Sequence, residues 1–389
     1  MTERAYWESS ERFELEATVV AHSIFEGRPS VVLDRTVFYP AAGGQMADRG
    51  TLRGSAQSAG VIDVQEAGGV VHHVLEGPAP AVGARVTCAV DPVRRREHMA
   101  LHTGQHMLSN ALLELCEAVT VSSRLGESAC TIDVDRADVS LDDARRAEDL
   151  VNRIVDEDRI VKAIFPSPEE LAALPLRKRP KVEARVRVVV VEGFDATPCG
   201  GTHCAHTAQV GLVWAQSVER YKGGTRVTFT AGPRARRGLR ERADALASLA
   251  ASLRCAPLEV SAIVGRQRDR LDGARAEAGQ AWARLADRLA AGAPEDHVTI
   301  IVDEAEAALV EPLLARLATG ARVAAIGVRS QDKLQVTIAR GPGSSADCGA
   351  LMKALAAAHA GRGGGRPQQA GGQLPAGVDL EAALRQRLG

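Results

Sequence analysis

His102-Thr103-Gly104-Gln105-His106 is the stretch that decides the fold of this chain, and it lies within residues 94–118, which have the pattern of one amphipathic helix. Two histidines four residues apart project from the same face of a helix, one turn apart, so their imidazoles can converge on a metal ion. Leucines at helical spacing mark the apolar side of this predicted helix: Leu101, Leu108, Leu112 and Leu115. The stretch therefore predicts a helix that carries half of a metal site.

A second motif, Cys199-Gly200-Gly201-Thr202-His203, follows much later in the chain. It offers a thiolate and a third imidazole on a tight glycine turn. Three nitrogens and one sulfur form a tetrahedral set that suits zinc. Either motif alone is a common coincidence, but together they predict one zinc ion per chain, bound by His102, His106, Cys199 and His203.

Length and composition are those of an ordinary soluble protein. With 389 residues, 45% hydrophobic and 25% charged, the chain is long enough for several domains. No apolar run approaches the length that spans a bilayer, and the N-terminus lacks the pattern of a signal peptide. Seven cysteines, an odd number without framework spacing, fit a reducing compartment. We therefore expect a cytoplasmic protein.

The formal net charge of −1 means that a polyanionic partner would have to be met by local basic patches. Three stretches are candidates: residues 94–96, 177–181 and 234–242. Solvated faces and helix ends are the alternative interpretation of each.

The hydrophobic pattern predicts an α+β protein. Residues 1–90 contain short alternating strands punctuated by glycine and proline, and they predict a small antiparallel β-barrel. Within it, residues 34–45 join a strand to a glycine loop that could approach a ligand closely, with a wide turn as the alternative. Residues 91–232 hold the histidine helix, further strands and a β-branched run at 186–191 before the cysteine turn. They predict an α+β zinc-binding domain.

The remaining chain predicts two further domains. Residues 233–292 are rich in alanine, arginine, leucine and glutamate, and Pro257 divides them into two helices that we expect to pair antiparallel as a helical arm. Residues 293–389 alternate strands with helices and predict a small α/β domain. Its glycine-rich stretch at 361–372 could be a flexible linker, but because a helix follows at 379–388 we interpret it as a loop inside a folded domain.

The order of the motifs carries a family resemblance. The chain reads Thr36-Val37-Phe38-Tyr39-Pro40, then Gly43-Gly44-Gln45, then the two zinc motifs. This order resembles the editing domain of alanyl-tRNA synthetase and the free-standing AlaX alanyl-tRNA editing proteins. The tail with Gly363-Gly364-Gly365-Arg366 is similar to the DHH-associated domain that ends the long form of that family. No nucleotide-binding catalytic domain precedes these motifs, so we expect a free-standing editing protein and not a complete synthetase.

Two positions depart from the family pattern. The loop reads Ala41-Ala42-Gly43-Gly44-Gln45-Met46, where the family has three glycines and a proline after the glutamine. Cys204 follows His203 directly and could compete for the metal. Neither change removes a ligand, but both leave the path of the loop and the role of Cys204 open.

The resemblance implies hydrolysis of the ester that joins serine or glycine to the terminal adenosine of alanine-specific tRNA. Zinc could polarise the ester carbonyl, lower the pKa of a bound water to about 7, or hold the amino group, and the sequence does not choose among these roles. Thr36, with Gln45 beside it, is the candidate for sensing the serine hydroxyl, because a buried polar group left unpaired by alanine costs about 1–3 kcal/mol. A plain strand threonine is the alternative.

Arg362 and Arg366 are the candidate tRNA contacts, because glycine amides beside them can follow a phosphate backbone. The resemblance also implies self-association through the C-terminal domain, so a homodimer is expected. The alternative function is a non-catalytic RNA-binding protein stapled by zinc, which would need the four ligands but neither Thr36 nor Gln45. A zinc peptidase is disfavoured, because Thr103 stands where the HExxH motif has glutamate.

Overall fold

The computed structural model describes residues 2–55, 57–178, 186–294 and 296–388. Contacts between residues divide the chain into two compact units, Met1–Ala245 and Leu246–Gly389. Both units mix helices and strands, so the predicted α+β class is confirmed. The finer division into four domains stays a prediction.

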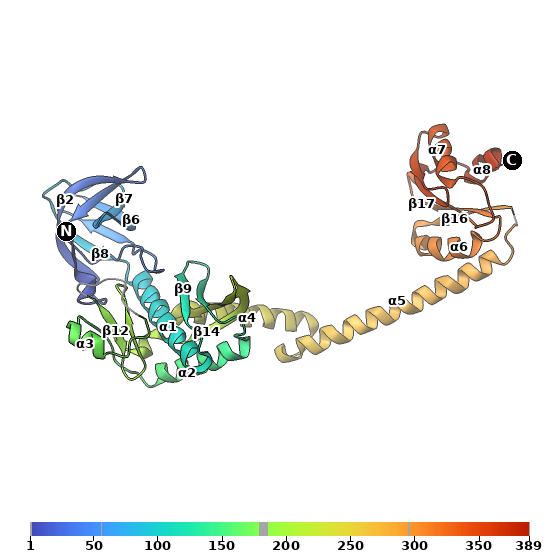
Figure 1. Ribbon diagram of the computed structural model, residues 1–389. Coiled ribbons are helices and arrows are strands. Elements are labelled where there is room, and N and C mark those ends of the chain that lie inside the picture. Colours follow the sequence, from blue (N-terminus) through green and yellow to red (C-terminus); the bar gives the residue numbers. More distant parts are fainter. Residues whose placement is uncertain (1, 56, 179–185, 295, 389) are drawn as a thin grey trace. The chain divides into compact units, whose positions relative to one another are not determined.

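A closed β-barrel forms the N-terminal part of the first unit, as predicted (Figure 1). Alternation along the strands places one set of apolar side chains inside the barrel, where Val19, Leu33 and Leu52 are fully buried. The strands, in their order around the barrel, are β2 (Glu14–Phe25), β3 (Arg28–Leu33), β7 (Val70–Glu76), β6 (Ser58–Ala67), β5 (Gly50–Arg53) and β8 (Arg85–Val90). The short strand β5 was not predicted.

The N-terminal residues are tied to the segment that follows strand β3 of the barrel. Strand β1 (Glu3–Arg4) pairs in parallel with β4 (Arg35–Thr36), and the 3-10 turn η1 (Ala5–Trp7) comes directly after it. This pairing brings Tyr6 and Trp7 next to Tyr39 of the glycine loop.

Helix α1 (Pro92–Cys116) carries the histidine pair and runs from the barrel into the rest of the first unit (Figure 1). It begins slightly before the predicted residue 94, because the side chain of Asp91 accepts from the amides of Val93 and Arg94 and proline suits the first turn. Every residue from His98 to Ser109 is buried. The helix is therefore covered on all sides, and its histidines lie inside the protein.

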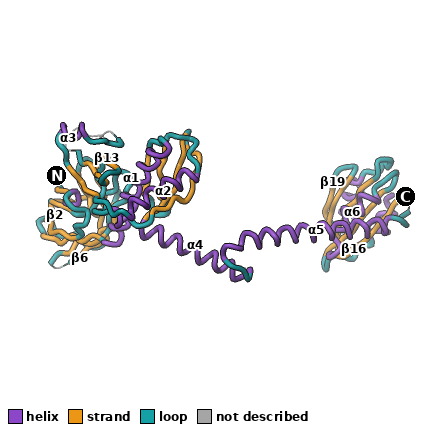
Figure 2. Tube along the Cα trace, turned by 90° about the horizontal axis from the view of Figure 1, so that it is seen from below, coloured by secondary structure: helices purple, strands orange, loops and turns teal. Residues whose placement is uncertain are grey.

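Two sheets and a second helix complete the first unit. Helix α2 (Leu141–Asp156) starts at a capping box between Ser140 and Asp143, as expected for a helix beginning there, and lies beside α1 (Figure 2). The four-stranded antiparallel sheet consists, in spatial order, of β14 (Val213–Tyr221), β15 (Gly224–Ala231), β10 (Cys130–Val134) and β9 (Thr120–Leu125). The three-stranded sheet consists of β11 (Val161–Ile164), β12 (Val188–Val191) and β13 (Asp195–Pro198), with the short helices α3 (Pro168–Ala173) and η2 (Thr207–Val210) nearby in sequence. The β-branched run is thus a central strand, as predicted.

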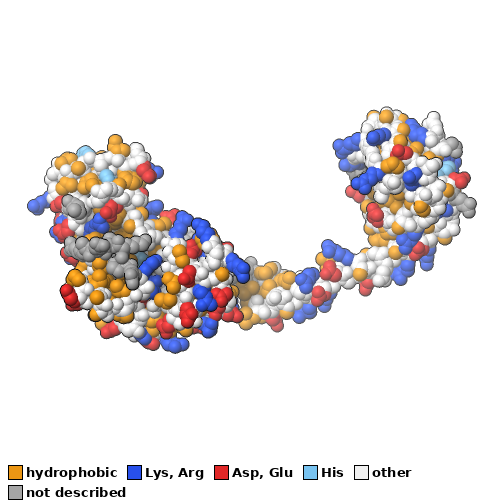
Figure 3. Space-filling model, in the orientation of Figure 1, with side chains coloured by type: hydrophobic (Ala, Val, Ile, Leu, Met, Phe, Trp, Pro, Cys, Tyr) orange, Lys and Arg blue, Asp and Glu red, His pale blue; other side chains and the backbone are white. Residues whose placement is uncertain are grey.

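The chain then forms two helices, α4 (Gly232–Leu253) and, after the turn η3 (Pro257–Glu259), α5 (Val260–Ala290). The prediction that they pair antiparallel is wrong, because the break between them bends the chain by only 76°. Several of their leucines are consequently partly exposed, Leu249 by 47% and Leu271 by 51%, and Leu258 in the turn between the helices is 94% exposed. Apolar side chains gather where α4 meets α5, while basic and acidic side chains alternate along α5 (Figure 3).

Among the described residues, no single helix is both long and apolar enough to cross a membrane. Only α4 taken together with Pro257–Ala290 meets that test, by length and composition alone, and this pair is sharply bent.

The second unit contains a five-stranded sheet covered on both faces. Helices α5 and α6 (Val310–Leu317), with the turn η4 (Glu304–Leu309), pack on one face, and α7 (Cys348–Ala358) and α8 (Leu380–Leu388) pack on the other (Figure 1). The strands in spatial order are β16 (His297–Asp303), β17 (Val323–Arg329), β18 (Lys333–Arg340), β20 (Gln369–Pro375) and β19 (Arg362–Gly365).

The glycine-rich stretch is an antiparallel hairpin of β19 and β20 and not the predicted loop. Its glycines make room for helix α7. A Cβ on Gly372 would lie 2.6 Å from Met352 Cε, and one on Gly363 would lie 2.9 Å from Met352 Cγ. The composition that suggests a loop therefore reflects close packing of a helix on two strands.

Candidate functional site

The four predicted zinc ligands converge in the first unit. One donor atom from each of His102, His106, Cys199 and His203 lies within 4.8 Å of the others. Cys199 Sγ is 3.5 Å from His102 Nε2 and 3.3 Å from His203 Nε2. Tetrahedral zinc, with bonds of about 2.0–2.1 Å to nitrogen and 2.3 Å to sulfur, places neighbouring ligand atoms roughly 3.5 Å apart. The donor types and their spacing therefore fit zinc.

The first histidine is oriented by the glycine loop of the barrel. His102 Nδ1 donates to Gln45 Oε1 over 2.7 Å, which turns the Nε2 atom of the same ring toward Cys199. Gln45 is itself fixed by Thr202, whose amide donates to Oε1 and whose hydroxyl accepts from Nε2. The predicted catalytic Gln45 thus contacts the metal ligands and is 2% exposed.

Of the other two histidines, His203 has a hydrogen-bond partner for its second ring nitrogen, and His106 has a carboxylate near it. Thr103 Oγ1 lies 3.2 Å from His203 Nδ1 and accepts from the amide of Cys204. Asp195 Oδ2 lies 3.6 Å from His106 Nδ1. Such partners fix the ring orientation of metal-binding histidines. His102 and His203 are therefore held with Nε2 as the nitrogen left for a metal. His106 Nδ1 is buried without a hydrogen bond from the described residues, and the Asp195 carboxylate is its nearest charged neighbour.

Asp195 is in turn fixed by two donors. Arg177 Nε donates to Asp195 Oδ1 over 3.0 Å, and the hydroxyl of Thr197 donates to both carboxylate oxygens. Burial alone would raise the pKa of Asp195, but its contacts with His106 and Arg177 lower it, so the group is a carboxylate at neutral pH. A negative charge therefore stands behind His106.

The glycine turn is held by its own carbonyls. Arg187 donates from one guanidinium nitrogen to the carbonyls of Cys199 and Gly201, and Trp7 Nε1 donates to the carbonyl of Gly200. A Cβ on Gly201 would overlap the His102 ring, with Nδ1 only 2.5 Å away. Glycine is required at this position because the backbone passes directly over the imidazole.

The charges of the site favour a thiolate. Burial would raise the pKa of Cys199, but the neighbouring His102, His106 and His203 hold it well below the ordinary thiol value. Burial and the nearby His102 lower the pKa of His203 to about 3, so this ring is neutral at physiological pH. The thiolate and the neutral His203 are in the protonation states that bind zinc. Burial would lower the pKa of His106, but Cys199 and Asp195 raise it, so zinc binding would have to displace a proton from this ring.

A buried ion pair fastens the glycine loop to the histidine helix. Arg95 and Asp48 are fully buried, and Arg95 Nε is 3.0 Å from both carboxylate oxygens of Asp48. Arg95 also donates to the carbonyl of Val37, while the amide of Tyr39 donates to Asp48. The glycine loop is therefore bonded to Arg95 of α1, directly at Val37 and through Asp48. These bonds hold Gln45 at a fixed distance from the metal ligands.

The structure places Thr36 in the barrel core, away from the ligands. Its hydroxyl lies 2.8 Å from His73 Nε2 and accepts from the amide of Phe38. His73 Nδ1 donates to the carbonyl of Val31, so the neutral ring accepts the Thr36 proton at Nε2. Burial lowers the pKa of His73 to about 4, which keeps the ring neutral. The role of Thr36 in sensing serine stays a prediction.

Two neighbouring residues have core environments. Cys204 packs in the hydrophobic core, and burial raises the pKa of its thiol to about 12, which makes it a poor competitor for the metal. His98, one turn before His102 on the helix, is buried beside Arg94 and does not join the cluster; burial lowers its pKa to about 4.

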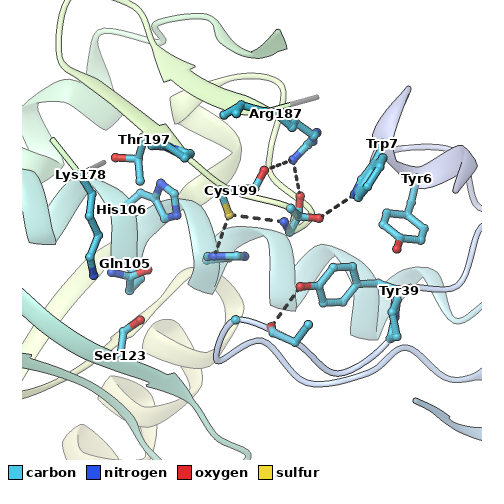
Figure 4. Close-up of a pocket in the computed structure, with 18 of the residues that line it drawn as sticks. Tyr6, Trp7, Tyr39, Gln105, His106, Ser123, Lys178, Arg187, Thr197 and Cys199 are labelled. Carbon is cyan, nitrogen blue, oxygen red and sulfur yellow. Dashed lines mark hydrogen bonds between the residues drawn. The ribbon is translucent and has the colours of Figure 1, made fainter. Parts of the chain in front are cut away.

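A cavity of about 580 Å³ opens beside the cluster, and His102, His106 and Cys199 form part of its wall. In Figure 4, Thr197, Gln105 and Ser123 lie on one side of Cys199, and Tyr6, Trp7 and Tyr39 lie on the other. The volume is that of a pocket for a small ligand or for the end of a larger one.

Some residues of the predicted basic patches form ion pairs within the protein. Arg95, Arg177 and Arg234 form ion pairs with Asp48, Asp195 and Glu97. The remaining patch residues 179–181 lie outside the described part of the chain. In the second unit, Arg362 and Arg366 are exposed; Arg362 donates to Gln373 across the hairpin.

Several site residues escaped the sequence interpretation. Asp195, Arg187 and Trp7 contact the cluster or its turn without forming a motif with it, and the contact of Thr103 with His203 was not predicted although Thr103 lies inside the histidine motif. The only local signal is Arg187, a charged residue within the otherwise β-branched run.

Comparisons with known proteins agree with the motifs. Residues 12–94 match the family model for tRNA synthetases class II (A), and residues 186–228 match the threonyl and alanyl tRNA synthetase second additional domain. The second match contains Cys199 and His203, and the first contains Thr36 and Gln45. The histidine pair lies between the two matches.

Curated relatives cover much of the chain. It is 36% identical over 241 residues to the alanyl-tRNA editing protein AlaX-L of Pyrococcus horikoshii. The aligned part is 60% of this chain and 59% of the relative. It is 32% identical over 399 residues to the alanine–tRNA ligase of Methanopyrus kandleri. This aligned part is 97% of this chain and 43% of the relative. The chain thus spans less than two thirds of these relatives, and the family resemblance predicted from the motifs is confirmed.

One solved structure, the C-Ala domain of alanyl-tRNA synthetase from Aquifex aeolicus, is similar to part of this chain. The match covers 25% of this chain and 92% of the C-Ala domain. The identity is 20% and the TM-score 0.22, a likeness too low to establish a common fold.

Proposed function

We propose that this chain, a relative of the alanyl-tRNA editing protein AlaX-L and of alanine–tRNA ligases, is a zinc-dependent hydrolase that removes serine or glycine from alanine-specific tRNA. The observation that carries the proposal is the convergence of His102, His106, Cys199 and His203 beside a cavity that the first three of them line. One relative is an alanyl-tRNA editing protein and the other an alanine–tRNA ligase, which supports tRNA as the partner.

The four ligands would hold zinc, which when bound supplies a Lewis acid or a water of lowered pKa for ester hydrolysis. Other residues around the cluster orient the ligands. Gln45 and Thr103 fix the imidazoles of His102 and His203, the Asp195 carboxylate lies beside His106, and Arg187 holds the carbonyls of the glycine turn. Three of the four ligands line the cavity, so a bound ester can reach the cluster from that side.

Polar side chains beside the cluster are suited to the amino acid. Gln105, Thr197 and Ser123 line the cavity on the side away from its aromatic residues (Figure 4). In this proposal the aminoacyl group lies there, and the ester oxygen is next to Cys199. Thr36 is bonded to His73 and does not line the cavity, so its proposed role in sensing the serine hydroxyl requires both an exchange of that bond and access of the hydroxyl to it.

The zinc proposal is tested by the variant Cys199→Ala. The purified protein should carry about one zinc per chain, whereas Cys199→Ala should carry less and lose deacylation of seryl-tRNA. Cys255→Ala is the matched control, because Cys255 is also a free, half-buried cysteine but lies outside the cluster. Full zinc occupancy and activity in Cys199→Ala would contradict the ligand assignment.

Arg362, on the edge strand β19, and Arg366, directly after it, are both exposed and are proposed to contact tRNA phosphates. Several phosphates must be neutralised in such a complex, so binding should weaken steeply with salt. Deleting residues 297–389 should raise the Michaelis constant for tRNA and flatten its salt dependence. A truncated protein with unchanged tRNA affinity at physiological salt would move the binding surface to the first unit.

A further inference from the structure

Tyr6 is a buried tyrosine whose hydroxyl has no partner among the described residues. Only 1% of its surface is exposed, and its ring packs edge-on against Trp7 and Tyr39, with centroids 6.2 and 5.4 Å away. The hydroxyl of Tyr39 donates to the carbonyl of Ala42 over 3.0 Å, whereas that of Tyr6 makes no hydrogen bond to the described part of the chain. Buried tyrosine hydroxyls usually have a partner, because an unpaired buried polar group costs about 1–3 kcal/mol. The Tyr6 hydroxyl is therefore free to bind a ligand.

The position and protonation of Tyr6 suit a hydrogen-bond donor in the metal cavity. Tyr6 lines that cavity together with His102, His106 and Cys199. Burial raises the pKa of the phenol, so the hydroxyl keeps its proton at neutral pH. A neutral donor that the fold holds in place at the wall of a cavity can bind an oxygen of a ligand without first breaking another bond.

Arg187, which lines the same cavity, is a buried cation without a carboxylate partner. It is 7% exposed, and no described carboxylate forms an ion pair with it. Only Nη1 donates to described residues, to the carbonyls of Cys199 and Gly201 over 2.8 and 2.9 Å, and Nε is buried without a partner. Arg177, by contrast, is paired with Asp195. A buried charge is costly unless it is paired, so the guanidinium of Arg187 leaves a positive charge for a ligand to offset.

Both groups lie on the same side of the thiol. Figure 4 shows Tyr6 and Arg187 on one side of Cys199, opposite to the polar side chains of Gln105 and Thr197. An ester that reaches the cluster with its amino acid on the polar side would turn its carbonyl oxygen toward Tyr6 and Arg187. A neutral donor and a cation beside each other at buried positions are the groups that stabilise negative charge on an oxygen.

We propose that the Tyr6 hydroxyl and the Arg187 guanidinium bind the oxyanion that forms on the ester carbonyl during hydrolysis, which makes both of them catalytic residues. The substrate in this proposal rests on the proposed function. In the reaction a water oxygen bonds to the ester carbon as it loses a proton, and the carbonyl electron pair moves to the carbonyl oxygen. When the oxyanion collapses, the carbonyl forms again and the bond to the ribose oxygen breaks. The ribose oxygen leaves with that bonding pair and takes up a proton, so Tyr6 and Arg187 only donate hydrogen bonds and neither loses its proton.

The test compares two analogues on one RNA hairpin that ends in single-stranded 3′ ACCA. One analogue carries serine through a planar amide, and the other carries the corresponding tetrahedral, anionic phosphonate ester, which resembles the oxyanion state. Fluorescence anisotropy measures both affinities with zinc-loaded protein. Wild-type protein should bind the phosphonate more tightly. Tyr6→Phe, which removes only the hydroxyl, should reduce this preference, and kcat for deacylation of seryl-tRNA, by about 100-fold, with KM unchanged.

Tyr39→Phe is the matched control for Tyr6→Phe. Tyr39 lines the same cavity and packs on Tyr6, but its hydroxyl is already bonded to the carbonyl of Ala42. The preference of Tyr39→Phe for the phosphonate should therefore stay as in wild type.

Arg187→Gln should lose the preference as Tyr6→Phe does, and Arg187→Lys, which keeps the charge, should retain part of it. Because Arg187 also holds the glycine turn, the zinc content of both variants is measured and the analogues are compared with zinc-loaded protein. Trp7→Phe removes the bond to the Gly200 carbonyl of the same turn without changing the charge. It should keep the wild-type preference, which separates loosening of the turn from loss of the cation.

Equal affinity of wild-type protein for the two analogues, or an unchanged preference in Tyr6→Phe or in zinc-loaded Arg187→Gln, overturns the proposal. These outcomes differ from failure of the proposed function, which wild-type deacylation tests by itself. If wild type releases serine from tRNA and Tyr6→Phe does so with the same kcat, the hydrolase stands and the oxyanion site falls. If wild type releases no serine but prefers the phosphonate, and Tyr6→Phe loses that preference, the anion site stands and the hydrolase falls.

Discussion

The substitution Gln45→Leu separates an orienting role of this residue from direct contact with substrate. Leucine has a similar volume but loses the acceptor for His102 Nδ1 and both bonds to Thr202. Loss of a partner that orients a metal ligand lowers metal affinity by about 10- to 100-fold, or roughly 1.4–2.8 kcal/mol. The buried groups left unpaired would cost about 1–3 kcal/mol of folding stability in addition.

The assay is competition for zinc with a chelator of known affinity at neutral pH. Gln65→Leu is the control, because Gln65 also lies in the barrel region and bonds to a neighbouring side chain, Asp63, far from the cluster in sequence. It should hold zinc as wild type does. Gln45→Glu keeps an acceptor for His102 and should fall between wild type and Gln45→Leu. Wild-type zinc affinity in Gln45→Leu would refute the orienting role.

Three further outcomes follow from the same geometry. Gly201→Ala should lose zinc, because the new Cβ overlaps the first histidine ligand, and metal analysis of the purified variant checks this. Thr36→Val should destabilise the barrel by about 1–3 kcal/mol by removing the partner of His73, and, if Thr36 senses serine, the ratio of serine to alanine release in deacylation assays should fall toward one. Burial lowers the pKa of His73 and His98 to about 4, so stability is complete above the unfolded value of about 6.5 and falls as the pH drops toward 4. Urea unfolding at pH 7 and 5 should show a loss of about 2 kcal/mol per histidine, reduced in His73→Gln.

The metal site was largely predictable because its motifs are local. A spacing of four residues on a helix fixes the relation of His102 to His106, and the glycine turn fixes that of Cys199 to His203. Neither motif alone predicts that the two histidines of the helix meet the cysteine and histidine of the turn. That expectation came from the donor chemistry of the combined set and from the resemblance, and the structure brings the four donor atoms together.

The partners of the ligands were not predictable in the same way. Gln45 comes from a barrel loop, and Asp195 lies on a strand far from His106 in sequence. Such contacts depend on how the barrel and sheets dock, here through the buried pair of Arg95 and Asp48. No periodicity or spacing in the sequence encodes that docking.

The second unit shows where composition misleads. Glycine-rich residues 361–372 have the composition of a loop, yet they form a hairpin whose missing side chains admit Met352 of helix α7. The leucines of α4 and α5 likewise specify an apolar stripe but not its partner, and the helices bend apart without covering it. A sequence pattern predicts that a surface is apolar or lacks side chains. Which element packs on that surface depends on the fold of the whole chain.

The central claim is that the cavity beside the cysteine–histidine cluster selects mischarged tRNA. The most direct measurement compares, side by side and with enzyme in excess, the release of serine and of alanine from alanine-specific tRNA, with Cys199→Ala as the inactive reference. The proposed function predicts rapid loss of serine, little loss of alanine, and neither in the variant. Equal release of both amino acids, or release of neither by the zinc-loaded protein, would contradict it.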